Sequence, residues 1–415
     1  MLTPQIIAPA GNLKKLKIAV NYGADAVYAG LSSFSLRSRA AKEFDETSFA
    51  EGIKYAHSKG VQVYATVNGF HVSAQLEGLK RHLALLAELK PDALIIASIG
   101  AMRLAKEIAP NIPIHVSTQA NILNYEDALV YKDLGAKRVV IARELGLKDA
   151  CDIAKNADIE IEAFVHGSMC FAYSGRCLIS AVQSGRRSNL GACANDCRFP
   201  YELYAKNPEN NALFRIVEDD LGTHIFNSKD LKLANYIDKI MEKNAINAFK
   251  IEGRTKSEYY VACATRTYKQ AVIDTLNNQF DAKKYDDELN TLKSRGFTDG
   301  YLMARPYEKD DTQNHETSIM QGTMQVHGFS ENGKSIASKG IIKKDYEYEI
   351  FAPLNASIEL VNNEIGEIYK RDDKYFCKFK KLINENNKEF GELHSGNINE
   401  ILSPSLLPEF SFLRA

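Results

Sequence analysis

The chain has 415 residues, of which 45% are hydrophobic and 25% are charged, and its formal net charge is −1. This composition is typical of a soluble globular protein, and the length predicts two or three domains. The near-neutral charge excludes an overall attraction to nucleic acid or anionic membrane, so a polyanion would have to bind at a local basic patch.

The first residues, MLTPQIIAPAGN, lack the basic start and apolar run of a secretory signal. No stretch approaches the roughly 20 apolar residues that cross a bilayer. We therefore expect a cytoplasmic protein with no membrane partner, in which thiols stay reduced.

Short β-rich runs alternate with amphipathic helical patterns over the first 255 residues. Such βα units with apolar strands predict a parallel sheet covered by helices, and eight strands predict a (β/α)8 TIM-like barrel. A doubly wound open sheet is the alternative, but no GxGxxG motif follows the first strand. The strand candidates are residues 5–8, 26–29, 61–66, 93–97, 112–116, 138–142, 161–165 and 248–252.

An insertion interrupts the repeat after strand seven, and we assign it to residues 166–222. It leaves from the carboxyl end of a strand, where barrel active sites are built. A strand-like run (223–231) and a helix (231–244) follow it, and residues 295–306 have the pattern of turns. We expect the barrel domain to span residues 1–320, and short alternating strands predict a small antiparallel β-barrel domain over 321–415.

Four of the seven cysteines lie in this insertion, as the pairs Cys170/Cys177 and Cys193/Cys197. In a reducing compartment, clustered thiols indicate metal ligation by zinc or an iron–sulfur cluster. Zinc sites favour CxxC pairs, so the longer spacings here favour iron–sulfur. The alternative of buried, inert thiols suits the remaining cysteines better. Those are Cys151, Cys263 and Cys377.

Polar side chains at strand ends form the candidate active site, because such ends converge on one mouth of a barrel. We assign catalytic roles to Glu162 and His166, which flank strand seven. Arginines suit an anionic substrate because they bind carboxylates bidentately. The alternative is that several of these groups only tie loops together, and Lys250 and Glu252 are expected to form a structural ion pair. The predicted substrate-binding residues are Arg37, Arg39, His115, Gln119 and Arg254.

The run Glu162–Cys170 (EAFVHGSMC), continued by GRCLIS, resembles the signature of peptidase family U32. The segments APAGN (8–12), HVSTQAN (115–121), FKIEGRTKS (249–257) and GFTDGY (296–301) agree with this resemblance. The layout is most similar to the branch implicated in 5-hydroxylation of the wobble uridine of tRNA.

The resemblance implies a 4Fe–4S cluster on Cys170, Cys177, Cys193 and Cys197, with zinc as the alternative metal. It also implies prephenate as co-substrate and hydroxyl source, a tRNA anticodon loop as partner, and an electron donor that the sequence does not identify. Basic residues around the cysteines and in the segment 374–381 would contact RNA phosphates. The basic residues near the cysteines are Arg176, Arg186, Arg187 and Arg198.

Two other functions fit the family resemblance. One is a collagenase-like peptidase, in which Cys170 beside His166 would be the nucleophile. The sequence contains no GxSxG, HExxH or SxxK motif to support it. The other is a non-catalytic iron–sulfur partner in a hydroxylation system.

Overall fold

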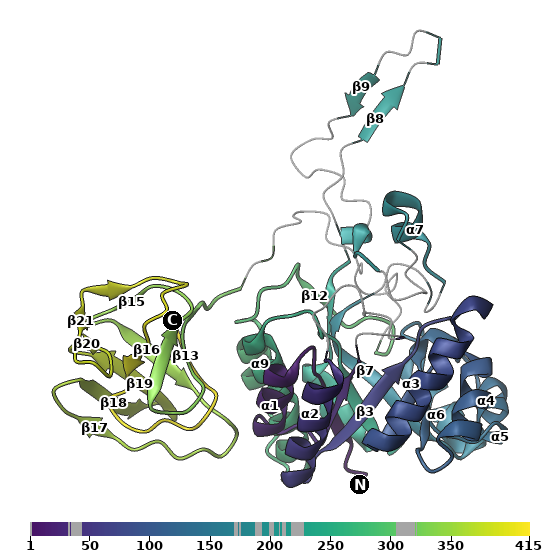
Figure 1. Cartoon of the computed structure of the whole chain (residues 1–415), viewed down its shortest axis with the longest axis horizontal. Coiled ribbons are helices and arrows are strands. Elements are labelled where there is room, and N and C mark those ends of the chain that lie inside the picture. Colours follow the sequence, from purple (N-terminus) through teal and green to yellow (C-terminus); the bar gives the residue numbers. More distant parts are fainter. Residues whose placement is uncertain are drawn as a thin grey trace.

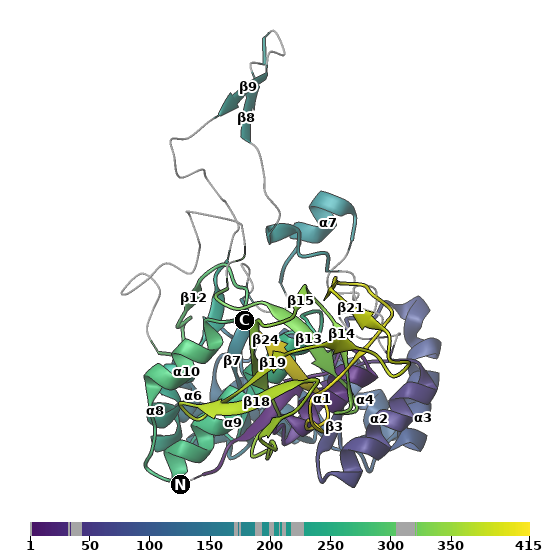
Figure 2. The same cartoon turned by 90° about the vertical axis from the view of Figure 1, so that its left-hand side faces the viewer.

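A computed structural model gives the architecture of the chain (Figure 1). It describes residues 2–31, 34, 44–169, 173, 176–186, 193–198, 203–206, 208–209, 213–216, 228–303, 320 and 322–415. Two bodies lie side by side in Figure 1, a helix-covered barrel and a smaller C-terminal sheet, and in Figure 2 the sheet lies in front of the barrel.

The predicted TIM-like barrel is confirmed, because eight parallel strands form a closed ring. The last strand pairs with β1 on one side and with β7 on the other, which leaves no open edge. The strands are β1 (Gln5–Pro9), β2 (Ala26–Ala29), β3 (Gln62–Val67), β4 (Ala93–Ile96), β5 (Ile114–Val116), β6 (Ala136–Val140), β7 (Glu160–Ser168) and β11 (Ala248–Ile251).

Helices surround the barrel, and side-chain caps at Asn12, Asp45, Asn124 and Ser257 satisfy backbone donors at the starts of four of them. Their apolar faces pack on the outward side chains of the strands in one continuous core. The helices are α1 (Leu13–Asn21), α2 (Glu46–Ser58), α3 (Leu76–Leu89), α4 (Ile99–Ile108), α5 (Tyr125–Asp133), α6 (Leu147–Ala157), α8 (Ile237–Glu242), α9 (Glu258–Leu276) and α10 (Ala282–Leu289).

Two short strands extend the sheet beside β7. Strand β10 (Asp230–Lys232) pairs antiparallel with the end of β7, and β12 (Phe297–Thr298) pairs with β10. The predicted helix over 231–244 therefore begins later, as a 3₁₀ turn followed by α8. The segment 295–306, predicted as turns, contributes β12. The predicted strand-like run over 223–231 overlaps the first two residues of β10, whereas β12 was missed because it is defined by pairing with a distant strand.

The insertion contains described elements above the barrel in Figure 1. Helix α7 (Ile179–Ser184) is followed by a 3₁₀ turn at Asp196–Arg198. Strands β8 (Leu203–Lys206) and β9 (Leu213–Ile216) form an antiparallel hairpin.

The C-terminal body is an antiparallel half-barrel with its own hydrophobic core. Its eight-stranded sheet has the order β17-β18-β19-β16-β24-β13-β14-β23, and two further pairs lie beside it. The sheet strands are β13 (Val326–Ser330), β14 (Ser335–Ser338), β16 (Glu347–Phe351), β17 (Val361–Asn362), β18 (Gly366–Arg371), β19 (Lys374–Phe379), β23 (Ile401–Leu402) and β24 (Ser411–Arg414). The further pairs join β15 (Ile342–Lys343) to β22 (Glu392–Leu393) and β20 (Leu382–Ile383) to β21 (Glu389–Phe390).

A buried arginine joins the two bodies. Arg414, at the end of β24, is 1% exposed and forms ion pairs with Glu288 of α10 and Glu349 of β16. The Tyr22 hydroxyl lies 2.9 Å from the carbonyls of both Phe351 and Phe410. Because breaking a buried pair leaves an uncompensated charge, these contacts fix the sheet against the barrel.

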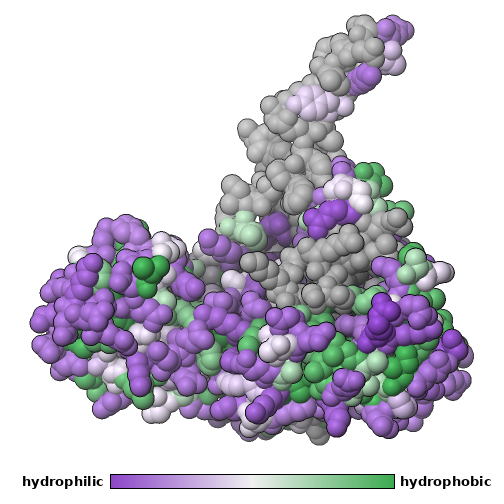
Figure 3. All heavy atoms as spheres, viewed as in Figure 1, coloured by the Kyte–Doolittle hydropathy of each residue, from purple (hydrophilic) through white to green (hydrophobic). Residues whose placement is uncertain are grey.

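Polar side chains cover much of the C-terminal sheet in Figure 3, whereas hydrophobic side chains gather over the helical face of the barrel. Among the described residues, no helix is long and apolar enough to cross a membrane.

Candidate active site at the barrel mouth

A buried ion network occupies the interior of the barrel. Glu162 of β7 lies 2.6 Å from the ammonium of Lys250 on β11 and 3.5 Å from the guanidinium of Arg138 on β6. Glu162 is fully buried, and both partners are at most 5% exposed. The inward alternation of adjacent strands places Lys250 against Glu162, and the charge of Glu252 also raises the pKa of Lys250. The expected ion pair of Lys250 with Glu252 stays a prediction.

Burial and neighbouring charges decide which groups of this network are ionised. Burial opposes ionisation of Glu162, but Lys250 and Arg138 together hold its pKa below the ordinary value. Burial, assisted by Arg138 and Lys250, lowers the pKa of His115 to about 3. At neutral pH the interior therefore contains a carboxylate locked between two cations and an uncharged imidazole. Glu162 is positioned to hold those cations in place.

Arg254 lies at the carboxyl end of the barrel, where the sequence places a substrate-binding group. Its guanidinium is 4% exposed and donates a hydrogen bond of 3.1 Å to the Thr66 hydroxyl at the end of β3. The Tyr28 hydroxyl on β2 donates to the Glu252 carboxylate at 3.1 Å. The ammonium of Lys250 lies 4.4 Å from the Tyr28 ring centroid. Three strands thus place two cations around one aromatic ring.

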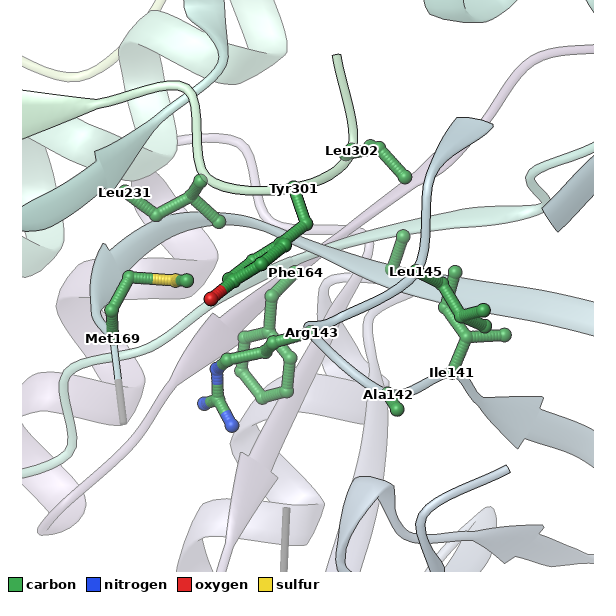
Figure 4. Close-up of a pocket in the computed structure, with 10 residues that line it drawn as sticks. Ile141, Ala142, Arg143, Leu145, Phe164, Met169, Leu231, Tyr301 and Leu302 are labelled. Atoms are coloured by element: carbon green, nitrogen blue, oxygen red, sulfur yellow. The ribbon is translucent and has the colours of Figure 1, made fainter. Parts of the chain in front are cut away.

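A further cation at the mouth, Arg143, was missed by sequence reasoning. Arg143 follows β6, and its guanidinium lies 3.9 Å from the centroid of the Phe164 ring (Figure 4). Met169 and Tyr301 line the same small cavity of about 20 Å³. A guanidinium stacked on an aromatic ring is held flat, with its N–H edge still able to bind an anion. The signal was available, since Arg143 lies just past the end of a predicted strand.

The two predicted catalytic residues lie on different faces of β7. The pairing of β7 with β11 shifts register between Lys250 and Ile251, so that Ile251 pairs with His166. Such a bulge reverses the inward–outward alternation beyond it. His166 therefore contacts Tyr260 and Tyr268 of α9, with ring centroids 5.6 and 5.4 Å away.

His166 is an uncharged imidazole in a buried polar pocket. Burial lowers its pKa to about 3, and the carboxylate of Asp230 opposes this effect only partly. Its Nδ1 lies 3.4 Å from the Tyr268 hydroxyl. Its Nε2 and Oδ1 of Asp230 have no hydrogen-bond partner among the described residues. Each buried polar atom without a partner costs free energy, and the inner network has two as well, Glu162 Oε2 and Arg138 Nη1, within the described residues.

Glycine is required immediately after His166. Gly167 has φ +101°, and a Cβ atom there would lie 2.4 Å from the Glu252 carbonyl oxygen. The same carbonyl accepts a hydrogen bond of 2.7 Å from Tyr260. The motif HGS thus sets the path by which the chain leaves β7 for the cysteine-bearing insertion.

Two hydrogen bonds join the described cysteine loops. Cys177 lies two residues before α7, Cys193 lies three residues before the 3₁₀ turn that follows α7, and Cys197 lies within that turn. The Ser180 hydroxyl accepts from the backbone of Ala194 at 3.2 Å, and the Ser184 hydroxyl donates to Asp196 at 3.1 Å. Cys177, Cys193 and Cys197 are all half-buried. Within the described residues no three potential ligands gather at metal-binding spacing.

Three predicted site residues, Arg37, Arg39 and Cys170, lie outside the described residues. Gln119 is half-buried, and its backbone N–H donates to the Ser117 hydroxyl at 3.3 Å.

The segment 374–381, predicted to contact RNA, contains β19 and the two residues after it, and acidic side chains pair with two of its lysines. Lys374 pairs with Glu349 at 3.2 Å, and Lys381 pairs with Glu364 at 3.7 Å.

Sequence reasoning also missed Arg138 and Asp230. Arg138 was recoverable, because a charge within a buried strand must find a partner in the barrel interior. Asp230 was not, since it meets His166 only through the antiparallel pairing of β10 with β7.

Together these features define a (β/α)8 barrel protein with a cationic mouth and a cysteine-bearing insertion beside it. The model of peptidase family U32 matches residues 11–312, and the chain belongs to this family.

Proteins named as tRNA hydroxylation factors are similar to this chain over nearly its full length. A protein of Helicobacter pylori named tRNA hydroxylation protein P is 56% identical over 99% of this chain and 98% of its own. The Escherichia coli protein of the same name is 34% identical over 88% of this chain and 91% of its own. A Porphyromonas gingivalis protein named collagenase is 32% identical over 72% of this chain and 74% of its own.

Proposed function

We propose that this protein hydroxylates tRNA at the 5-position of the wobble uridine. The observation that carries the proposal is its similarity to tRNA hydroxylation protein P of Helicobacter pylori, which is 56% identical over 413 residues and extends through the C-terminal sheet. Uridine in an anticodon loop is unpaired, so its base can enter the barrel mouth without opening a duplex.

The cations of the mouth support binding of prephenate, a dicarboxylate, as hydroxyl source. Arg254, Lys250 and Arg143 lie at or just below the strand ends. Charge-assisted hydrogen bonds from arginine hold carboxylates in a fixed orientation. Burial lowers the pKa of Lys250, and Glu162 opposes this shift and holds the ammonium in position, while Tyr28 and Phe164 provide the flat walls of the site.

The cysteine loops support a metal cofactor. We propose that Cys170, Cys177, Cys193 and Cys197 bind a 4Fe–4S cluster. Three of these thiols lie on loops that Ser180 and Ser184 join, and four thiolates are a suitable donor set for such a cluster. The cluster would supply one-electron redox chemistry.

His166 suits a role in moving a proton. It is uncharged, and its Nε2 has no partner among the described residues. The imidazole is therefore able to accept or donate one proton at that atom, while Asp230 stabilises the protonated form.

Nucleoside mass spectrometry tests the proposal. We expect tRNA from a strain lacking the gene to lose 5-hydroxyuridine-derived nucleosides, and a plasmid copy to restore them. An unchanged nucleoside profile in the deletion strain would overturn the proposed function.

The cofactor has its own experiment. Protein purified without oxygen should show the visible absorbance of an iron–sulfur chromophore, and Cys193→Ser with Cys197→Ser should abolish it. The matched control is Cys377→Ser, because that thiol is buried in the C-terminal sheet. A colourless wild-type protein that contains stoichiometric zinc would show that the cysteines bind zinc and not an iron–sulfur cluster.

A further inference from the structure

A large cavity lies between the barrel and the C-terminal sheet. It has a volume of about 540 Å³ and is lined by residues 255–260, 291–293, 320, 324–326, 339 and 412. Cavities of several hundred cubic ångströms at a junction of two bodies are common binding sites. The network around Glu162 lies inside the barrel, so this cavity is separate from it.

Three lysines from three different elements converge on this cavity. Lys256 precedes α9, Lys293 follows α10, and Lys339 follows β14. The ammonium groups of Lys293 and Lys339 form no ion pair within the described part of the chain, whereas Lys256 lies 3.4 Å from Asp230. Among the described lining residues, Glu258 is the one acidic side chain against three lysines, so this part of the wall has an excess of positive charge.

The remaining lining provides hydrogen-bond donors and aromatic surface. Helix α9 has 19 residues and begins at the wall, where its N-terminal N–H groups add positive potential. Ser257 contributes a hydroxyl, whereas the Thr291 hydroxyl already donates to the Glu288 carbonyl, and Tyr260 and Phe412 contribute aromatic rings. Lysines, helix N-terminal amides and hydroxyls together are the donor set that binds phosphate in proteins.

The cavity wall connects directly to the candidate active site. Residue 255 follows Arg254 in the chain, so the wall begins where the barrel mouth ends. The Tyr260 hydroxyl donates to the carbonyl of Glu252, and the Tyr260 ring packs on His166. A nucleotide at the mouth would therefore have its neighbouring backbone beside this cavity.

We propose that the cavity binds a phosphodiester group of the RNA substrate, on the strand next to the nucleotide held in the barrel mouth. This inference rests on the proposed function. It assigns the C-terminal sheet a role in substrate binding, through Lys339, and explains why the sheet is fixed against the barrel by Arg414.

RNA binding to the full chain tests the proposal. The probe is a synthetic anticodon stem-loop with an unmodified wobble uridine, titrated at several salt concentrations. We expect Lys293→Ala with Lys339→Ala to weaken binding by roughly 10-fold and to reduce the slope of log affinity against log salt by about 1. Lys54→Ala with Lys388→Ala is the matched control, since both lysines are exposed and neither lines the cavity.

The RNA-binding experiment has three informative outcomes. Weaker binding with a reduced salt slope, restored by Lys293→Arg with Lys339→Arg, supports the proposal. Affinity and slope equal to those of the control pair overturn it. Binding of inorganic phosphate that requires both lysines, with RNA affinity unchanged, would assign the cavity to a small ligand instead and also overturns it. Since binding is measured without hydroxylation, failure here is distinguishable from failure of the proposed function.

Discussion

The two faces of strand β7 differ in how their buried charges are compensated. On the inner face, the carboxylate of Glu162 lies between the cations of Lys250 and Arg138, although Glu162 Oε2 and Arg138 Nη1 have no hydrogen-bond partner among the described residues. On the outer face, His166 and Asp230 each leave one polar atom without a partner among the described residues. The charges of the inner face therefore compensate one another, as in a structural support, whereas the outer face holds an uncharged imidazole close to a carboxylate.

This difference arises from a single bulge. Without it, residues 162 and 166 would point to the same side of β7, as strict alternation predicts. The bulge turns His166 toward α9 and beneath the start of the insertion. If the inner face stabilises the fold and the outer face takes part in the reaction, substitutions on the two faces should differ in their effects.

The largest effect on stability is expected for Glu162→Ala. The substitution leaves Lys250 and Arg138 buried without their carboxylate, which costs about 3–5 kcal/mol of unfolding free energy. Urea unfolding monitored by circular dichroism measures it. Glu160→Ala is the control, because Glu160 contacts the same arginine but is half exposed. Equal losses in the two variants would refute a buried network.

The second largest effect on stability is expected for Gly167→Ala, at the point where the chain leaves β7. Gly167→Ala places a Cβ against the Glu252 carbonyl at positive φ, and we expect a loss of about 3 kcal/mol. Gly60→Ala also has positive φ, but nothing lies within 4 Å of its Cβ, so it should cost only about 1 kcal/mol. Thermal unfolding compares the two. A milder effect at Gly167 than at Gly60 would contradict the close approach.

A pH dependence follows from the buried imidazole of the outer face. The pKa of His166 is about 3 in the folded chain against an ordinary value of 6.5, so protons bind preferentially to the unfolded chain. The stability that burying an uncharged His166 contributes is fully present above pH 6.5. It is lost as the pH falls toward 3, by up to about 1.4 kcal/mol of unfolding free energy per pH unit. In His166→Gln the slope of unfolding free energy against pH should be smaller by that amount. Parallel curves for the variant and the wild type would show that His166 is not buried and uncharged.

The smallest effect is expected at the mouth. Arg254→Met removes a cation but leaves the barrel closed, so we expect about 10-fold less tRNA hydroxylation, or about 1.4 kcal/mol, with folding retained. Arg103→Met is the control, because Arg103 is exposed and pairs only with Glu107 on α4. Identical nucleoside profiles for both variants would exclude Arg254 from substrate binding.

The barrel was predictable from the sequence because each strand is an apolar run bounded by helix stops. The cationic mouth was partly predictable, since Arg254 follows a strand end. The bulge at His166 was not, because it depends on the register against β11. The predicted strand-like run over 223–231 reached β10, but the antiparallel pairing of β10 with β7 was not predictable from local pattern.

The most direct measurement is nucleoside mass spectrometry of tRNA from a deletion strain with three plasmid-borne copies of the gene. Wild type and Cys377→Ser should restore the hydroxylated wobble uridine, whereas Cys193→Ser with Cys197→Ser should not, although it accumulates to the same level. Full hydroxylation in the strain without any copy, or with the double variant, would contradict a cysteine-dependent tRNA hydroxylase.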